Sequence, residues 1–119
     1  MHSYSQLAQV YSKQGEYLQA EQVLNQGLNL SPRNHFLLGQ LIGTLTNLGK
    51  SEQAITRFQQ FVQQPGYRFG RQSQVIANRY LVCCKKTRNK TAASWLYKHY
   101  GRELDQCNED LFFAIYQQN

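Results

Sequence analysis

The feature that most constrains this chain is a self-similarity with a period of 34 residues. Residues that correspond at this offset are similar in type: Leu7 and Leu41, Tyr11 and Leu45, Gly15 and Gly49, Ala20 and Ala54, and Leu24 and Phe58. A repeat of this length indicates one supersecondary unit used more than once, because a single unit cannot bury its apolar face alone. We therefore expect a stack of similar units.

Within one period the residue types predict a pair of helices. Leu7 and Tyr11 share one face of a first helix, four positions apart. Gly15 is expected to end that helix, because a left-handed cap suits a residue without Cβ. Ala20 is small enough to let the second helix approach the first closely. Pro32 closes the unit, since proline cannot continue a helix.

The third unit follows the pattern loosely. Residues 76–80 (IANRY) echo residues 7–11 (LAQVY) at an offset of 69, one more than two full periods. Either its first helix is about one turn longer, or residues 85–90 (KKTRNK) form a long loop. We expect Thr91 and Asn108 to cap the last two helices. The predicted helices, with no competing strand signal, lie near residues 2–14, 17–30, 35–48, 51–63, 72–86, 92–100 and 109–117.

The charge of the chain is unevenly spread. The net charge is +6, and residues 68–102 hold nine basic residues and no acidic one. Aromatic residues are interleaved with these cations, a combination that suits single-stranded nucleic acid. The alternative interpretation is that the rings are core residues and the cations a solvated face.

Signals for catalysis, metals and membranes are weak. Cys83 and Cys84 are adjacent and Cys107 is the third cysteine, so we expect free thiols in a reducing compartment, not a disulfide framework or a zinc site. The histidines are scattered, and residues 43–52 (GTLTNLGKSE) resemble a phosphate loop only superficially. We expect no enzyme activity, cofactor or metal. No stretch reaches the roughly 18 apolar residues of a membrane span, and no secretory signal precedes the first unit, which favours the cytoplasm.

The residues quoted above closely resemble the tetratricopeptide repeat. The resemblance implies an all-α, right-handed solenoid of three helix pairs with a C-terminal capping helix. As one domain over 1–119, the units would be 1–34, 35–68, a degenerate 69–102, and a terminal helix at 105–119. Members of the family are rarely enzymes, and their first helices line a concave groove that holds extended or helical peptides from partner proteins.

Carrying that groove onto this chain gives a set of expected partner-binding residues. They are Ser5, Gln9, Lys13, Phe36, Gly39, Gln40, Gly43, Asn47, Arg71, Gln74 and Asn78. Gly39 and Gly43 each weaken a helix by up to about 1 kcal/mol, which suggests that a peptide backbone or a bulky side chain approaches them. The clamp that some members use for a C-terminal carboxylate is incomplete here, because only Asn78 and Arg71 fit it. Amides and glycines instead suit hydrogen bonding to a peptide main chain.

The last helix carries six consecutive apolar residues, 111–116 (LFFAIY). These residues cover every face of a helix that should be polar on its outer side. Phe112, Phe113 and Tyr116 are therefore expected to form a second interface, through which the chain joins another copy or a different subunit.

We interpret the chain as a non-enzymatic adaptor, or more narrowly a chaperone or assembly factor of a secretion-type machine. The alternative is a nucleic-acid-binding helical repeat that uses residues 68–102.

Overall fold

The structure is a computed structural model that describes residues 3–118, so the expected boundaries at residues 1, 2 and 119 lie outside the described residues. Over this range it contains helices and no strand, as the sequence predicts. The helices are α1 (Tyr4–Lys13), α2 (Tyr17–Leu30), α3 (His35–Asn47), α4 (Ser51–Val62), α5 (Arg71–Thr87), α6 (Lys90–Tyr100), the short 3-10 helix η1 (Gly101–Glu103) and α7 (Gln106–Tyr116).

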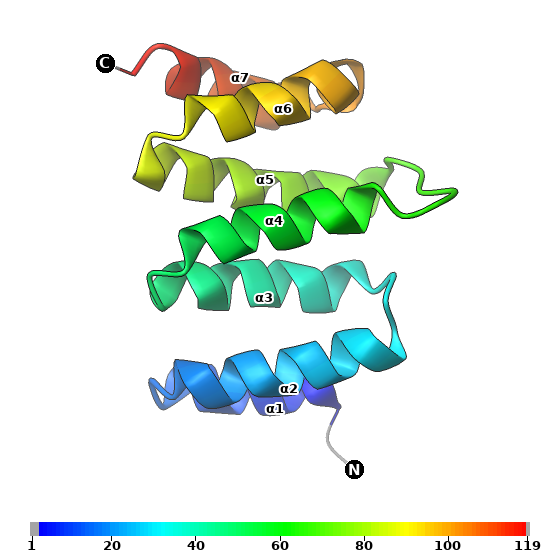
Figure 1. Ribbon diagram of the computed structural model, residues 1–119, viewed down its shortest axis with the longest axis vertical. Coiled ribbons are helices and arrows are strands. Elements are labelled where there is room, and N and C mark those ends of the chain that lie inside the picture. Colours follow the sequence, from blue (N-terminus) through cyan, green and yellow to red (C-terminus); the bar gives the residue numbers. More distant parts are fainter. Residues whose placement is uncertain (1–2, 119) are drawn as a thin grey trace.

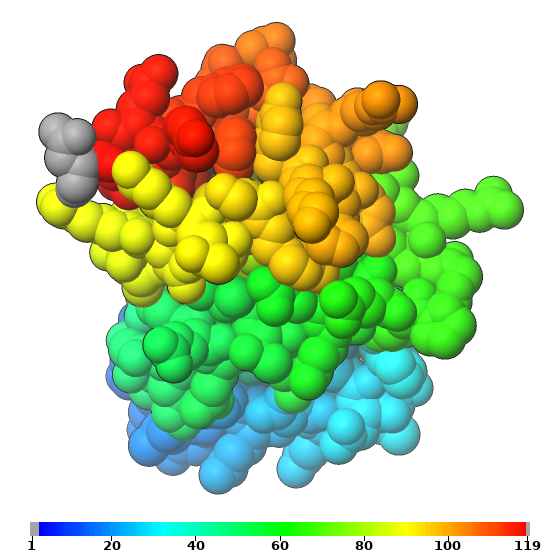
Figure 2. All heavy atoms as spheres, turned by 45° about the horizontal axis from the view of Figure 1, so that its top comes forward, coloured from blue at the N-terminus to red at the C-terminus, as the bar shows by residue number. Residues whose placement is uncertain are grey.

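Successive helices form hairpins that stack along the longest axis of the molecule (Figure 1). The resulting body measures 43 × 33 × 20 Å. The first helices of the pairs also pack on one another, α1 on α3, α3 on α5 and α5 on α7. Helix α7 therefore occupies the place of a first helix in a fourth pair. Figure 2 shows that the α4–α5 segment, in bright green, projects from the side of the stack.

The turns inside the first two pairs have the same geometry. Gly15 and Gly49 have φ angles of 77° and 74°, the left-handed conformation expected for a cap glycine. In each turn the amide of the following residue donates back across the turn, from Glu16 to the Tyr11 carbonyl and from Lys50 to the Leu45 carbonyl, both at 2.8 Å. The correspondence in sequence is thus a correspondence in backbone structure.

In the third pair the first helix is longer, and residues 85–90 do not form a long loop. Helix α5 has 17 residues, and only Arg88 and Asn89 separate it from α6. Arg88 adopts the left-handed conformation, with φ at 54°, which lets so short a connection reverse the chain. The α4–α5 connection, residues 63–70, is the long one.

Both predicted caps near the C-terminus were wrong. Asn89, not Thr91, caps α6, and its side chain accepts from the Ala92 amide at 3.0 Å. Asp105, not Asn108, caps α7, and its carboxylate accepts from the Asn108 amide at 2.9 Å. In both places an earlier Asn or Asp reaches the free N–H groups first, so the helix begins sooner than the apolar pattern suggested. Asn108 is consequently inside the helix, where it is buried.

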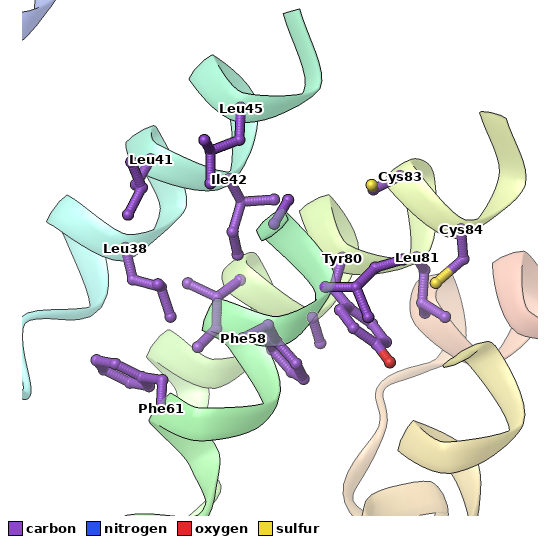
Figure 3. Packing of buried hydrophobic residues seen from close by; sticks show 14 of the residues in the cluster. Leu38, Leu41, Ile42, Leu45, Phe58, Phe61, Tyr80, Leu81, Cys83 and Cys84 are labelled. Atoms are coloured by element: carbon purple, nitrogen blue, oxygen red, sulfur yellow. The ribbon is translucent and has the colours of Figure 1, made fainter. Parts of the chain in front are cut away.

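One apolar core runs through the stack, and its centre lies between α3, α4 and α5 (Figure 3). The rings of Phe58 and Tyr80 stack there with centroids 4.2 Å apart, and both side chains are fully buried. Leu38, Leu41 and Leu45 lie inward from α3, as the sequence predicts. The core fixes how the first helices sit beside one another, and so it shapes the surface that they present.

Candidate functional site

Two adjoining hollows run along the first helices of the pairs. One, of about 420 Å³, lies between α1, α3 and α5, and the other, of about 580 Å³, lies between α3, α5 and the start of α7. They share Gly43, Asn47 and Arg79 as common walls. We call the two hollows together the groove.

Most of the residues expected from the sequence line this groove. Gln9, Lys13 and Gln40 line the smaller hollow, Gln74 and Asn78 line the larger one, and Gly43 and Asn47 line both. Four other expected residues, Ser5, Phe36, Gly39 and Arg71, are not among the residues that line either hollow. Phe36 and Arg71 are exposed near the beginnings of their helices, and Gly39 is buried beneath the surface.

The group that approaches the two glycines is the side chain of Arg79. A Cβ added at Gly39 would lie 3.3 Å from Nε of Arg79, and one added at Gly43 would lie 3.3 Å from its Nη1. These distances are tighter than ordinary van der Waals contact, so a larger residue would push the arginine aside. Because Gly39 and Gly43 have no side chains, Arg79 of α5 lies directly against this part of α3.

Several amides expected to face a partner instead bind groups of the same chain. Gln74 donates from Nε2 to the Glu103 carbonyl at 2.5 Å, and its Oε1 accepts from the Asp105 amide at 3.0 Å. Asn108, only 1% exposed, donates from Nδ2 to the Gln74 carbonyl at 2.9 Å and accepts from Nδ2 of Asn78 at 3.2 Å. This network joins α7 to α5. On the other side, Gln40 donates to the Ser5 carbonyl at 3.3 Å and joins α3 to α1.

The residues that line the groove include three cations. Lys13, Arg79 and Lys86 are exposed lining residues, and none takes part in an ion pair among residues 3–118, where Lys50 and Glu21 form one at 2.9 Å. Asp105 is the acidic residue in the lining, and its carboxylate already caps α7. The groove therefore presents unpaired positive charge.

Sequence reasoning missed Arg79, Lys86 and Asn108. Arg79 corresponds to Val10 of the first unit, because residues 76–80 (IANRY) match residues 7–11 (LAQVY). A cation at a position that is apolar in the first unit was the signal available in the sequence. Its relation to Gly39 and Gly43 joins residues about forty positions apart and carries no local signature. Asn108 was misread because a cap and a buried helical asparagine look alike in sequence.

The aromatic residues of the basic segment are mostly engaged in packing. Tyr80 is fully buried, Phe69 stacks on Tyr100 with centroids 5.0 Å apart, and Trp95 stacks on His99 at 4.3 Å. Tyr97 stacks on Phe112 at 4.4 Å. In the part of the chain that the structure describes, the walls of the two hollows contain no aromatic ring.

The three residues expected at the second interface have different environments. Phe112 is 6% exposed and lies against Tyr97, so it belongs to the core and is not available to a partner. Phe113 and Tyr116 are 42% and 61% exposed. Only these two of the three rings present apolar surface.

No cluster of three or more His, Cys, Asp or Glu side chains that could hold a metal ion occurs within residues 3–118. None of the helices over the same residues has the length and apolar character that crossing a bilayer requires.

Comparison with known proteins finds a family model that is similar to the first helix pair. The family model of the tetratricopeptide repeat matches residues 2–34, which include α1 and α2. No curated protein and no solved structure matches the chain. Tetratricopeptide repeats generally mediate protein–protein interaction, and proteins of the family are typically non-enzymatic adaptors. This match covers the first helix pair, and the other helices within residues 3–118 continue the stack.

Proposed function

We propose that the protein is an adaptor that holds a segment of a partner protein in the groove. The observation that supports this most is the position of the two hollows, which follow the first helices of three successive pairs. A surface made by several repeat units suits an elongated ligand, because each unit adds contacts along its length. Gln9 and Asn47 are exposed amides in the lining that suit hydrogen bonds to a peptide main chain.

The alternative, binding of nucleic acid by residues 68–102, has less support. The nine basic residues of this segment are exposed, which would suit phosphate contacts. Its rings, however, pack against one another and against the core, and base stacking needs aromatic faces beside the cations.

A narrower version of the proposal is a chaperone or assembly factor in the cytoplasm. Cys83 and Cys84 are buried free thiols and Cys107 is an exposed one. Thiols of this kind fit a reducing compartment, where they stay unpaired. The size of the chain and its helical-repeat architecture are compatible with a small protein that shields a segment of another subunit.

Selection from a random peptide display library tests the groove directly. We expect wild type to enrich peptides that no longer bind Gly43→Leu, because the leucine fills the shared wall of both hollows. Gly43 is the better position for this block, since a side chain at the buried Gly39 would also meet Ile76. Gln60→Leu is the matched control, because Gln60 is exposed on α4 and lines hollows outside the groove. Peptides that bind both variants equally would rule out the groove as the binding site.

Self-association through α7 stays a separate proposal. Phe113 and Tyr116 are its exposed rings, three positions apart on the same helix. Sedimentation velocity over a wide concentration range should show a dimer that dissociates in the Phe113→Ser, Tyr116→Ser double variant. A monomer at the highest concentration would contradict this.

A further inference from the structure

We propose that the groove selects acidic segments, and that Arg79 is the residue that binds their carboxylates. This inference rests on the proposed function, because it names the chemical class of the partner segment held in the same groove. The groups recognised are carboxylate side chains along the partner segment. Arg79 is not among the partner-binding residues that the sequence predicted.

Arg79 is placed so that its side chain lies against α3. Its side chain extends over Gly39 and Gly43, with Nε near one glycine and Nη1 near the other. Two residues without side chains, one helical turn apart, leave room for the whole arginine to lie against α3. The guanidinium is thereby brought to the wall that both hollows share. An arginine so held loses less conformational freedom on binding than one that extends into solvent.

The charge of the groove is predominantly positive. Lys13 stands in the smaller hollow and Lys86 in the larger one, with Arg79 between them in both. Among residues 3–118 the acidic side chain in the two walls is that of Asp105, which accepts from the Asn108 amide as the cap of α7. The cations therefore have no carboxylate partner among residues 3–118. An acidic ligand would supply one.

The amides between α5 and α7 are already engaged in hydrogen bonds within the chain. Gln74 and Asn108 bind each other and neighbouring backbone, and Asn78 donates to Asn108, so these amides serve the fold. A guanidinium, in contrast, offers a planar set of donors that matches a carboxylate with two parallel hydrogen bonds. The described residues of the walls include no aromatic ring that would stack on bases, so a protein segment fits better than a nucleic acid.

Fluorescence anisotropy with defined peptides tests the proposal on the full chain. The probes are fluorescein-labelled 12-residue peptides that carry four glutamates, four glutamines or four lysines in the same Gly-Ser-Ala background. We expect the glutamate peptide to bind about tenfold or more tightly than the glutamine peptide, since charge-assisted hydrogen bonds are strong. Arg79→Gln should remove that preference, and Arg79→Lys should restore part of it, because lysine keeps the charge without the planar donors.

Arg71→Gln is the matched control, because it removes the same charge from the same helix outside the two hollows. It should leave the affinity for the glutamate peptide within about twofold. A circular dichroism melt of each variant verifies that the helices are intact. Equal loss of affinity in Arg71→Gln and Arg79→Gln would overturn the proposal, since the effect would then be one of net charge.

Other outcomes distinguish the preference for acidic segments from the proposed adaptor function. Displayed peptides that need an open groove but have no excess of acidic residues would overturn the acidic preference and leave the adaptor function in place. Failure of the display selection together with all three probes would overturn both. A labelled 12-nucleotide oligo-dT that binds through Arg79 more tightly than the glutamate peptide would overturn the inference in favour of nucleic acid.

Discussion

The two faces of α5 have contrasting environments, one in the core and the other in the groove. Tyr80 points into the core, where its hydroxyl donates to the Ala92 carbonyl at 2.6 Å and accepts from Gln59 at 3.2 Å. Arg79, its neighbour in sequence, lies in the groove. Cys83 and Cys84 are buried, whereas Val82 and Lys86 line the larger hollow.

Helix α5 thus carries core-packing residues on one face and groove-lining residues on the other. Its core face is filled by large side chains that join α4, α5 and α6. Its groove face is joined to α7 by amides and presents two cations, Arg79 and Lys86, that form no ion pair among residues 3–118. Changes on the core face should therefore alter the free energy of unfolding strongly, and changes on the groove face should alter it less.

Truncation of Tyr80 is expected to have the largest effect. Tyr80→Ala should lower the free energy of unfolding by about 3–5 kcal/mol, because it removes a fully buried ring and leaves a cavity beside Phe58. Urea denaturation followed by circular dichroism measures the change. Tyr116→Ala is the control, since that ring is 61% exposed and its loss should cost less than about 1 kcal/mol. Similar losses in the two variants would contradict a core role for Tyr80.

Thiol reactivity should next separate the core, at Cys84 of α5, from the groove, at Cys107 of α7. Burial raises the pKa of the Cys84 thiol to about 12, so hardly any thiolate forms there at pH 8. Cys107 is exposed in the larger hollow. With a chromogenic disulfide reagent at pH 8, we expect one thiol to react at once, and Cys84 to react on the order of a thousandfold more slowly.

Cys107→Ser should abolish the fast phase of that reaction without changing the slow one. If two thiols reacted at once in the native protein, the core face of α5 would not be sealed.

Removal of the buried amide between α5 and α7 should have a smaller effect. Asn108→Ala leaves Nδ2 of Asn78 and Oε1 of Gln74 each without one hydrogen-bond partner. We expect a loss of about 1–3 kcal/mol, because part of the hydrogen-bonded network becomes unsatisfied in a partly buried site. Asn29→Ala, at an exposed position on α2, should change the stability by less than about 0.5 kcal/mol. Chemical denaturation again measures both, and equal values would show that the network does not hold α7.

The smallest effect concerns the first turn of α5. The Nε2 of His35 lies 3.0 Å from the Tyr67 hydroxyl, which lies 2.5 Å from Oγ of Ser73. Burial lowers the pKa of His35 below its ordinary 6.5. The unfolded chain therefore binds this proton at a higher pH than the folded protein does. The free energy of unfolding should fall as the pH drops from 7.5 through 6.5 and the lower folded pKa.

Urea midpoints between pH 7.5 and 5 measure this dependence. His35→Phe should make it flatter, because the titrating group is gone. A steeper dependence in the variant, or a wild-type protein that gained stability on acidification, would contradict the assigned direction of the pKa shift.

Much of the fold was predictable because its causes lie within a few residues of one another. Gly15 and Gly49 marked the turns through backbone sterics, and the apolar spacing placed the core residues of α3. The caps at Asn89 and Asp105 were missed because several candidate residues lie close together, and sequence alone does not tell which one reaches the free amides.

The groove was predictable only in outline. Gln9, Gly43 and Asn47 were expected in it and do line it, yet the roles of Gln74 and Arg79 depend on partners about thirty to forty positions away. Whether a polar side chain is free for a ligand depends on which neighbour reaches it first, and that is a property of helix packing.

The sequence by itself determined the helical pairs, their turns and the inward faces, since periodicity and backbone conformation are set within one unit. Only the tertiary structure decided which inner-face groups stay free, because the register between separate helices brings Asn108 to Gln74 and lays Arg79 along Gly39 and Gly43. Contacts of that kind arise from packing across units, where no local pattern records them.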